Sequence, residues 1–91
     1  MPLKPTRILQ TNEFKRAYAK KGSAQRNSIK RALRLLAEDV YYPSLRVHKL
    51  EGVGDIRGAH ATDNQVISLT VDGSVVTLRT CCNHKDVYRR P

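Results

Sequence analysis

The chain has 91 residues, which is enough for one modest hydrophobic core but not for two, so we expect a single domain spanning residues 1–91. Its formal net charge of +9 is large for this size and points to nucleic acid, the ribosome or an acidic protein as a partner. The sequence has neither a long apolar segment nor a signal-peptide pattern, so we expect a cytoplasmic protein with no membrane partner.

The two cysteines are adjacent, at Cys81 and Cys82. This spacing suits neither a disulfide framework nor the spaced ligands of a zinc site. We therefore expect reduced, partly buried thiols, no metal and no cofactor. The sequence also lacks a glycine-rich phosphate loop and a serine nucleophile elbow, which argues against those classes of enzyme.

The positive charge is concentrated at one end of the chain. Residues 1–34 hold ten of the seventeen basic residues and only one acidic residue, Glu13, whereas residues 35–91 are neutral in sum. A cluster of this kind indicates a polyanion-binding surface rather than isolated solvated charges.

The first half of the chain predicts one strand and two helices. Residues 7–10 form a short first strand, and Thr11 or Asn12 caps a helix from residue 13 to about 21 that carries two aromatic residues four positions apart. A second helix runs from about residue 24 to 39, because apolar residues recur there at helical spacing. These residues are Ile29, Ala32, Leu33, Leu36, Ala37 and Val40. Basic residues fill much of its remaining circumference.

The second half of the chain predicts strands. Residues 45–50 alternate imperfectly, residues 56–61 form the next strand, and two β-branched runs flank Asp72-Gly73 as a hairpin with a type I′ turn. In this register Leu69 lies opposite Val76. One face of the hairpin is then apolar, with Ile67, Leu69, Val71, Val76 and Leu78. The other face carries Ser68, Thr70, Thr77 and Arg79.

The element order is therefore β-α-α-β-β-β-β. This order predicts an α+β fold in which two N-terminal helices pack on one face of a mostly antiparallel sheet of four to five strands.

The chain resembles the RelE/ParE superfamily of bacterial toxins over nearly its whole length. The resemblance rests on the order of elements, the segment LRVHKLEG at residues 45–52, the hairpin and the closing segment HKDVY at residues 84–88. It implies the toxin of a type II toxin–antitoxin pair. RelE-like members cut messenger RNA in the ribosomal A site without a metal, so the implied partners are a cognate antitoxin, the ribosome and messenger RNA, with DNA reached only through the antitoxin.

The resemblance also implies roles for individual residues. Lys49 matches a basic residue of the second strand, His84 and Tyr88 match a terminal segment that often holds catalytic groups, and Arg79 lies near a phosphate-binding arginine. The chain departs from the family pattern at Arg57, where members have an aromatic residue, at His60, where they have an arginine, and at residues 65–66, where they have a Tyr-Arg pair. These departures leave catalytic activity open.

Cleavage of RNA at a ribose 2′-hydroxyl needs a base, cations for the extra charge on phosphorus, and an acid for the departing 5′ oxygen. Histidine, arginine, lysine and tyrosine supply these groups. The candidate catalytic residues are His84, Arg79, Tyr88 and His60. The candidate RNA-binding residues are Lys49, Arg46, Lys30, Arg31, Arg34 and Lys85. His48 is interpreted as a strand residue only.

Two alternatives stay open. In the first alternative, the chain is a ParE-like inhibitor of DNA gyrase with no catalytic activity, which the missing Tyr-Arg pair favours. In the second, it is a basic module that binds RNA or the ribosome without catalysis. Cleavage of a translated message distinguishes the toxin enzyme from both.

Overall fold

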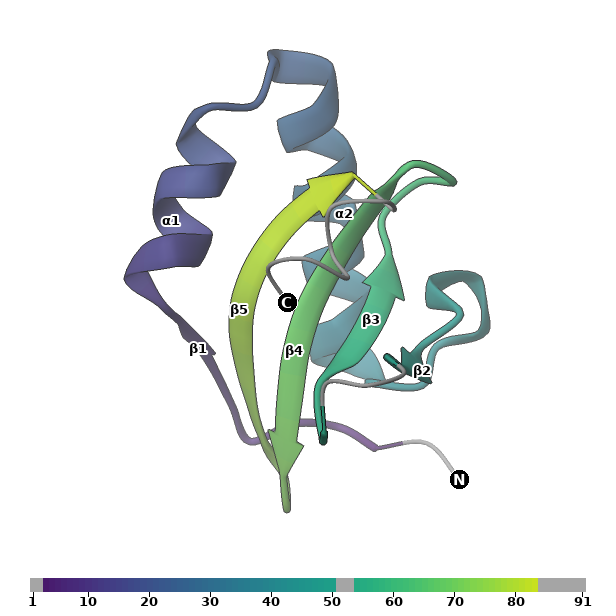
Figure 1. The fold of residues 1–91 in the computed structure, drawn as a ribbon. Coiled ribbons are helices and arrows are strands. Elements are labelled where there is room, and N and C mark those ends of the chain that lie inside the picture. Colours follow the sequence, from purple (N-terminus) through teal and green to yellow (C-terminus); the bar gives the residue numbers. More distant parts are fainter. Residues whose placement is uncertain (1–2, 51–53, 84–91) are drawn as a thin grey trace.

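A computed structural model describes residues 3–50 and 54–83 of the chain (Figure 1). It confirms the predicted order of elements and the two-layer α+β fold. The elements are β1 (Arg7–Gln10), α1 (Asn12–Ala19), α2 (Ser23–Glu38), a short 3-10 helix η1 (Pro43–Leu45), β2 (His48–Lys49), β3 (Arg57–His60), β4 (Gln65–Asp72) and β5 (Val75–Asn83).

The five strands form one sheet in the order β1-β5-β4-β3-β2. β1 runs parallel to β5, and every other neighbouring pair is antiparallel. α2 lies behind the sheet, and α1 runs beside β5 (Figure 1). One face of the sheet therefore packs against the helices, and we call the opposite face the outer face. Neither helix in the described ranges has the length and apolar content needed to cross a membrane.

The hydrophobic core lies between α2 and the helix-facing side of the sheet. Ile29, Ala32 and Leu36 are buried at helical spacing on α2, as the sequence pattern predicted. Phe14 of α1 packs in the same cluster. The sheet contributes Ala59, Ile67, Leu69, Val76, Leu78 and Cys81. The apolar face predicted for the hairpin is thus the face that the helices cover.

Thr11, one of the two predicted caps, connects α1 to the sheet. Its Oγ1 accepts a hydrogen bond from the amide of Phe14 at 3.1 Å and donates one to the carbonyl of Arg79 at 2.8 Å. One hydroxyl therefore satisfies a free amide at the helix start and holds the helix against β5.

The hairpin has the predicted faces but a different pairing. Its loop begins at Gly73, because Asp72 still belongs to the strand ladder. Gly73 has a φ of 61°, and Ser74 after it does not have a positive φ, so the turn is of type II′ and not of the predicted type I′, which needs a positive φ at both residues. Leu69 consequently lies opposite Leu78 and not opposite Val76. The predicted register was wrong by two residues, and a shift of two preserves the side-chain alternation.

A β-bulge interrupts the β4–β5 ladder. Leu69 pairs with Leu78 and Ser68 pairs with Thr80, so β5 has one more residue than β4 at this point, and that residue is Arg79. After the bulge, Cys81 returns to the core as a free, buried thiol. Burial raises the pKa of the Cys81 thiol, and the positive charge of Lys21 opposes part of that rise.

The strand predicted over residues 45–50 is mostly wrong. Only His48–Lys49 pairs in the sheet. Pro43 begins the 3-10 helix η1, and Arg46 ends it in the left-handed conformation, with φ 47° and ψ 46°. A left-handed residue cannot continue an extended strand, so the strand starts only after it.

Candidate functional site

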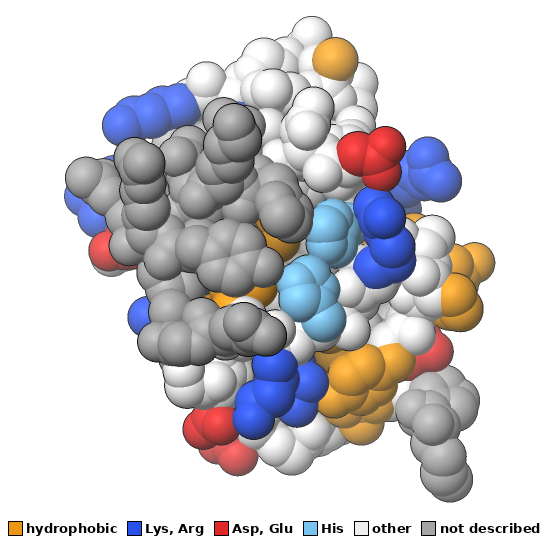
Figure 2. Space-filling view, turned by 45° about the vertical axis from the view of Figure 1, so that its right-hand side comes forward, with side chains coloured by type: hydrophobic (Ala, Val, Ile, Leu, Met, Phe, Trp, Pro, Cys, Tyr) orange, Lys and Arg blue, Asp and Glu red, His pale blue; other side chains and the backbone are white. Residues whose placement is uncertain are grey.

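Two histidines stack on the outer face of the sheet near its β2 edge. His48 on β2 pairs with Gly58 of β3, and His60 lies two residues further along β3, so both side chains point to the same side. Their ring centroids are 5.3 Å apart with an angle of 28° between the ring planes. Figure 2 shows the two histidines side by side at the surface, with basic side chains to their right and below them.

A hydrogen bond fixes the tautomer of His48. Its Nδ1 lies 2.9 Å from the carbonyl oxygen of Arg46. A carbonyl oxygen only accepts hydrogen bonds, so Nδ1 carries the hydrogen in this contact. In the neutral ring the lone pair is then on Nε2, and that nitrogen is available as a base.

The left-handed backbone of Arg46 directs this carbonyl toward the ring. Such a conformation costs roughly 1–2 kcal/mol for a residue other than glycine. The guanidinium of Arg46 also forms an ion pair with Asp63 in the β3–β4 connection, with Nη2 and Oδ1 2.9 Å apart. Both side chains are largely exposed, so the pair adds little stability. Arg46, a predicted RNA contact, therefore has an acidic neighbour.

Gly58 allows the histidine pair to lie close to the sheet. A Cβ atom at this position would lie 3.0 Å from Val66 Cγ1, 3.1 Å from Leu50 Cδ2 and 3.5 Å from His48 Cε1. Val66 and Leu50 form a small buried cluster on the outer face, against which Ile56 packs. Atoms of Val66, Leu50 and His48 therefore surround the space that a side chain at position 58 would take.

Replacing Gly58 by alanine should lower the free energy of unfolding by about 1–3 kcal/mol, because buried neighbours would have to move for the new methyl group. Urea unfolding would measure this loss. Gly22→Ser is the matched control, because no atom lies within 4 Å of a Cβ there and serine caps a helix well. An unchanged unfolding midpoint for Gly58→Ala would mean that this cluster has room to relax.

His60 also borders a small cavity at the edge of the sheet. The cavity has a volume of about 70 Å³ and lies between α2, η1 and the end of β3. Arg31 of α2, a predicted RNA contact, lines the same cavity. The fold therefore brings one basic residue of α2 to a cavity that His60 also lines, although the two residues are far apart in the sequence.

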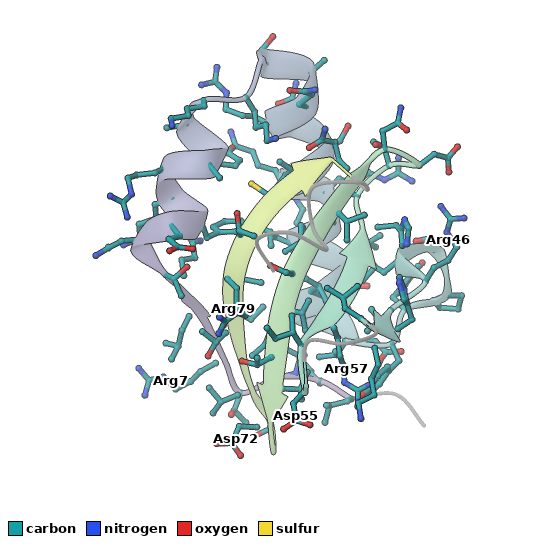
Figure 3. All side chains as sticks on the ribbon, viewed as in Figure 1. Arg7, Arg46, Asp55, Arg57, Asp72 and Arg79 are labelled. Atoms are coloured by element: carbon teal, nitrogen blue, oxygen red, sulfur yellow. The ribbon has the colours of Figure 1, made fainter. Side chains whose placement is uncertain are left out.

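Arg79 lies on the same sheet at some distance from the histidines. β4 separates β5 from β3, which places Arg79 about 10 Å across the sheet from the β3 backbone. Figure 3 shows Arg79 on β5, with Arg46 and Arg57 toward the opposite edge of the sheet. Arg79 is exposed and, with Thr11, Asn12 and Glu13, lines a second hollow of about 270 Å³.

The remaining predicted residues are more scattered. Lys49 pairs with Arg57, and strand alternation turns both away from the side that carries His48. Lys30 and Arg34 are exposed on α2, in the helix layer. Three predicted residues, His84, Lys85 and Tyr88, lie outside the described residues. Within residues 3–50 and 54–83 no three His, Cys, Asp or Glu side chains gather as metal ligands would.

His48 is the functional candidate that the sequence reasoning missed. It was interpreted as a strand residue only, and the structure places it against His60. The useful signal was the presence of two histidines on neighbouring predicted strands, but it required the β2–β3 register. That register depends on where the strand begins, and the left-handed Arg46 shifts this start.

No protein-family model and no curated protein sequence matches the chain. Its fold, however, is similar to solved toxin structures. The YafQ structure from Escherichia coli matches with a TM-score of 0.75 at 14% identity, over 89% of this chain and 96% of that one. The YoeB/ParE toxin from Agrobacterium tumefaciens matches with a TM-score of 0.72 at 14% identity, over 87% and 99% of the two chains.

The RelB-RelE antitoxin–toxin complex from Methanococcus jannaschii also matches, with a TM-score of 0.68 at 18% identity over 89% of this chain and 95% of that one. At these identities the likeness concerns the fold. It agrees with the superfamily resemblance found in the sequence: the chain has the RelE-like toxin fold.

Proposed function

We propose that this chain is the toxin of a type II toxin–antitoxin pair and that it cleaves messenger RNA on the ribosome, with His48 and His60 as its acid–base pair. The observation that carries the proposal is the stacked histidine pair, whose rings are 5.3 Å apart on the outer face of a RelE-like fold. A surface pair of imidazoles beside basic side chains suits proton transfer at an RNA phosphate.

In the proposed reaction, Nε2 of His48 takes the proton of a ribose 2′-hydroxyl, and the 2′ oxygen forms a bond to the adjacent phosphorus. The bond from phosphorus to the 5′ oxygen breaks, and protonated His60 gives its proton to that oxygen. The products are a 2′,3′-cyclic phosphate and a 5′-hydroxyl. Two rings at this distance would repel one another if both were charged, so the pair suits one neutral base and one charged acid.

The cations near the pair support binding of the RNA strand. Arg31 lines the cavity next to His60, where its charge would favour a nearby phosphate. Arg79 lies two strands away and would contact a different part of the strand. The chain lacks the family's Tyr-Arg pair at residues 65–66. Cations from α2 and β5 would contact the RNA strand in its place.

The proposal includes an antitoxin partner. The similar RelE structure is a complex with the RelB antitoxin. In this chain the exposed cations of α1 and α2, together with its net charge of +9, would complement an acidic partner as well as ribosomal RNA.

Primer extension on a translated message after brief induction of the protein tests this function, with an untranslated copy of the message as control. New 5′ ends in the translated copy alone are the expected result. Growth arrest without new ends, accompanied by inhibition of DNA supercoiling, would replace the proposal with the gyrase inhibitor. The absence of both cleavage and arrest would leave a binding module.

A further inference from the structure

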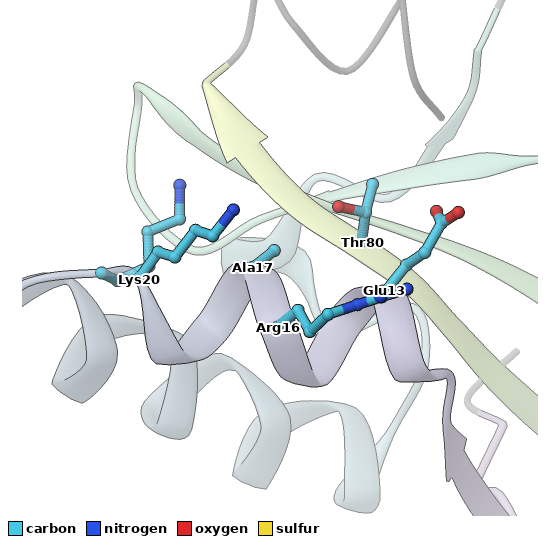
Figure 4. Close-up of a pocket in the computed structure, with 6 residues that line it drawn as sticks. Glu13, Arg16, Ala17, Lys20 and Thr80 are labelled. Carbon is cyan, nitrogen blue, oxygen red and sulfur yellow. The ribbon is translucent and has the colours of Figure 1, made fainter.

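Arg46 is the one residue other than glycine, within residues 3–50 and 54–83, that adopts a left-handed backbone. A residue with a side chain rarely takes this conformation, and it keeps it only where surrounding contacts hold it there. Strained residues of this kind gather at functional sites. The larger groove of about 450 Å³ between α1 and β5 has none among its lining residues (Figure 4). The strain instead lies two residues before His48, the proposed base.

Three contacts, one from each part of Arg46, hold this conformation. Its N–H donates a hydrogen bond to the carbonyl of Pro43 at 3.2 Å, which closes the 3-10 helix. Its carbonyl accepts a hydrogen bond from Nδ1 of His48 at 2.9 Å. Its guanidinium pairs with Asp63, in the connection that follows the strand of His60. The turn before β2 is thereby tied to the connection after β3, and these two strands carry both rings.

The carbonyl of Arg46 decides which nitrogen of His48 can act as the base. An isolated neutral imidazole side chain prefers its hydrogen on Nε2, and that nitrogen then has no lone pair to offer. The bond to Arg46 reverses this preference, because the hydrogen must lie on Nδ1 to reach the carbonyl oxygen. An extended backbone at residue 46 would direct the carbonyl elsewhere, and the ring would lose this bond.

We infer that Arg46 is a positioning residue, whose left-handed backbone holds the neutral ring of His48 in the tautomer that leaves the lone pair on Nε2. The inference rests on the proposed function, in which His48 takes the proton of the 2′-hydroxyl. The role belongs to the backbone of Arg46, so it differs from the RNA contact that was predicted for the side chain. The ion pair with Asp63 only supports it, because the two side chains are 59% and 96% exposed.

Two substitutions at the same position separate the backbone from the side chain. Arg46→Val and Arg46→Gly both remove the guanidinium, but valine strongly disfavours the left-handed conformation and glycine adopts it readily. Long-range proton–nitrogen NMR spectra of the full chain, at a pH where the ring is neutral, show which ring nitrogen carries the hydrogen. The hydrogen should lie on Nδ1 of His48 in the unaltered chain and in Arg46→Gly, and mainly on Nε2 in Arg46→Val.

The single-turnover rate of cleavage on programmed ribosomes is the second readout. Arg46→Val should lower this rate about 10- to 100-fold, because a hydrogen then occupies the nitrogen that acts as the base. Arg46→Gly should lower it less than about fivefold, which is the most that an exposed ion pair contributes. Asp63→Ala removes only the ion pair and should stay within the same limit.

Arg57→Val is the matched control for the NMR readout. It removes the same charge from the neighbouring strand β3, where the extended backbone suits valine, and it should leave the tautomer of His48 unchanged. Thermal unfolding of each variant shows that it is folded.

Three results would overturn the inference. One is a hydrogen on Nε2 of His48 in the unaltered chain. Another is a folded Arg46→Val chain that keeps both the tautomer and the rate. The third is a loss of about tenfold or more in Arg46→Gly, which would assign Arg46 to RNA binding through its guanidinium. The NMR readout involves no cleavage, so it tests the position of the ring even where primer extension shows no new ends and the proposed function fails.

Discussion

Replacing His48 by alanine should lower the rate of cleavage of a translated message by about 10²–10⁴-fold, the usual contribution of a positioned acid or base. The expected loss follows from the tautomer of His48, which leaves Nε2 as the proton acceptor. His60→Ala should cause a loss of similar size, because its ring stacks on that of His48. The single-turnover rate on programmed ribosomes is the quantity to measure.

The double variant gives the more specific result. If the two rings act as a unit, His48→Ala/His60→Ala should be hardly slower than either single variant. Asn27→Ala, an exposed and uncharged position on α2, is the control and should cleave at the unaltered rate. Thermal unfolding of each variant separates lost chemistry from lost fold. Full activity in either single variant, with the fold intact, would remove the histidine pair from the reaction.

Leu36→Ala should lower the free energy of unfolding by about 2–5 kcal/mol, the largest effect expected of any single truncation on α2. Leu36 is fully buried at the centre of the helix-facing layer, so the change removes apolar contact and leaves a cavity that the sheet cannot close. For a domain of this size such a loss is a large part of the total stability. Urea unfolding followed by circular dichroism measures it.

The same truncation on the surface provides the comparison. Leu9 is 40% exposed on β1, and Leu9→Ala should cost no more than about 0.5 kcal/mol. A small loss at Leu36 would indicate that α2 is loosely packed and that its apolar stripe is not the main source of stability.

Local patterns in the sequence were sufficient for most of the fold. The apolar period of α2, the Thr11 cap and the β-branched runs of the hairpin are short-range signals, and each led to the observed element. The hairpin register was not predictable in the same way. It depended on whether Asp72 ends the strand or begins the loop, and alternation alone cannot separate registers that differ by two residues.

The candidate site was harder to predict from the sequence than the fold. Arg46 carries no sequence signal for a left-handed conformation, and this one residue shortens the predicted strand and aims the carbonyl that orients His48. Arg31 and His60 line one cavity only because α2 packs against η1, which no local pattern predicts. The roles assigned to His84, Lys85 and Tyr88 stay predictions, since they lie outside the described residues.

The bulge at Arg79 has a consequence for how this position can vary. On either side of it, residues 75–78 and 80–81 of β5 lie opposite residues of β4, so their side chains must suit either the core or the outer face. Arg79 is the added residue of the bulge, because Leu78 and Thr80 on either side of it pair with Leu69 and Ser68, which are consecutive in β4. Position 79 therefore behaves as an insertion that the sheet tolerates, and selection can choose its side chain for a ligand without disturbing the core.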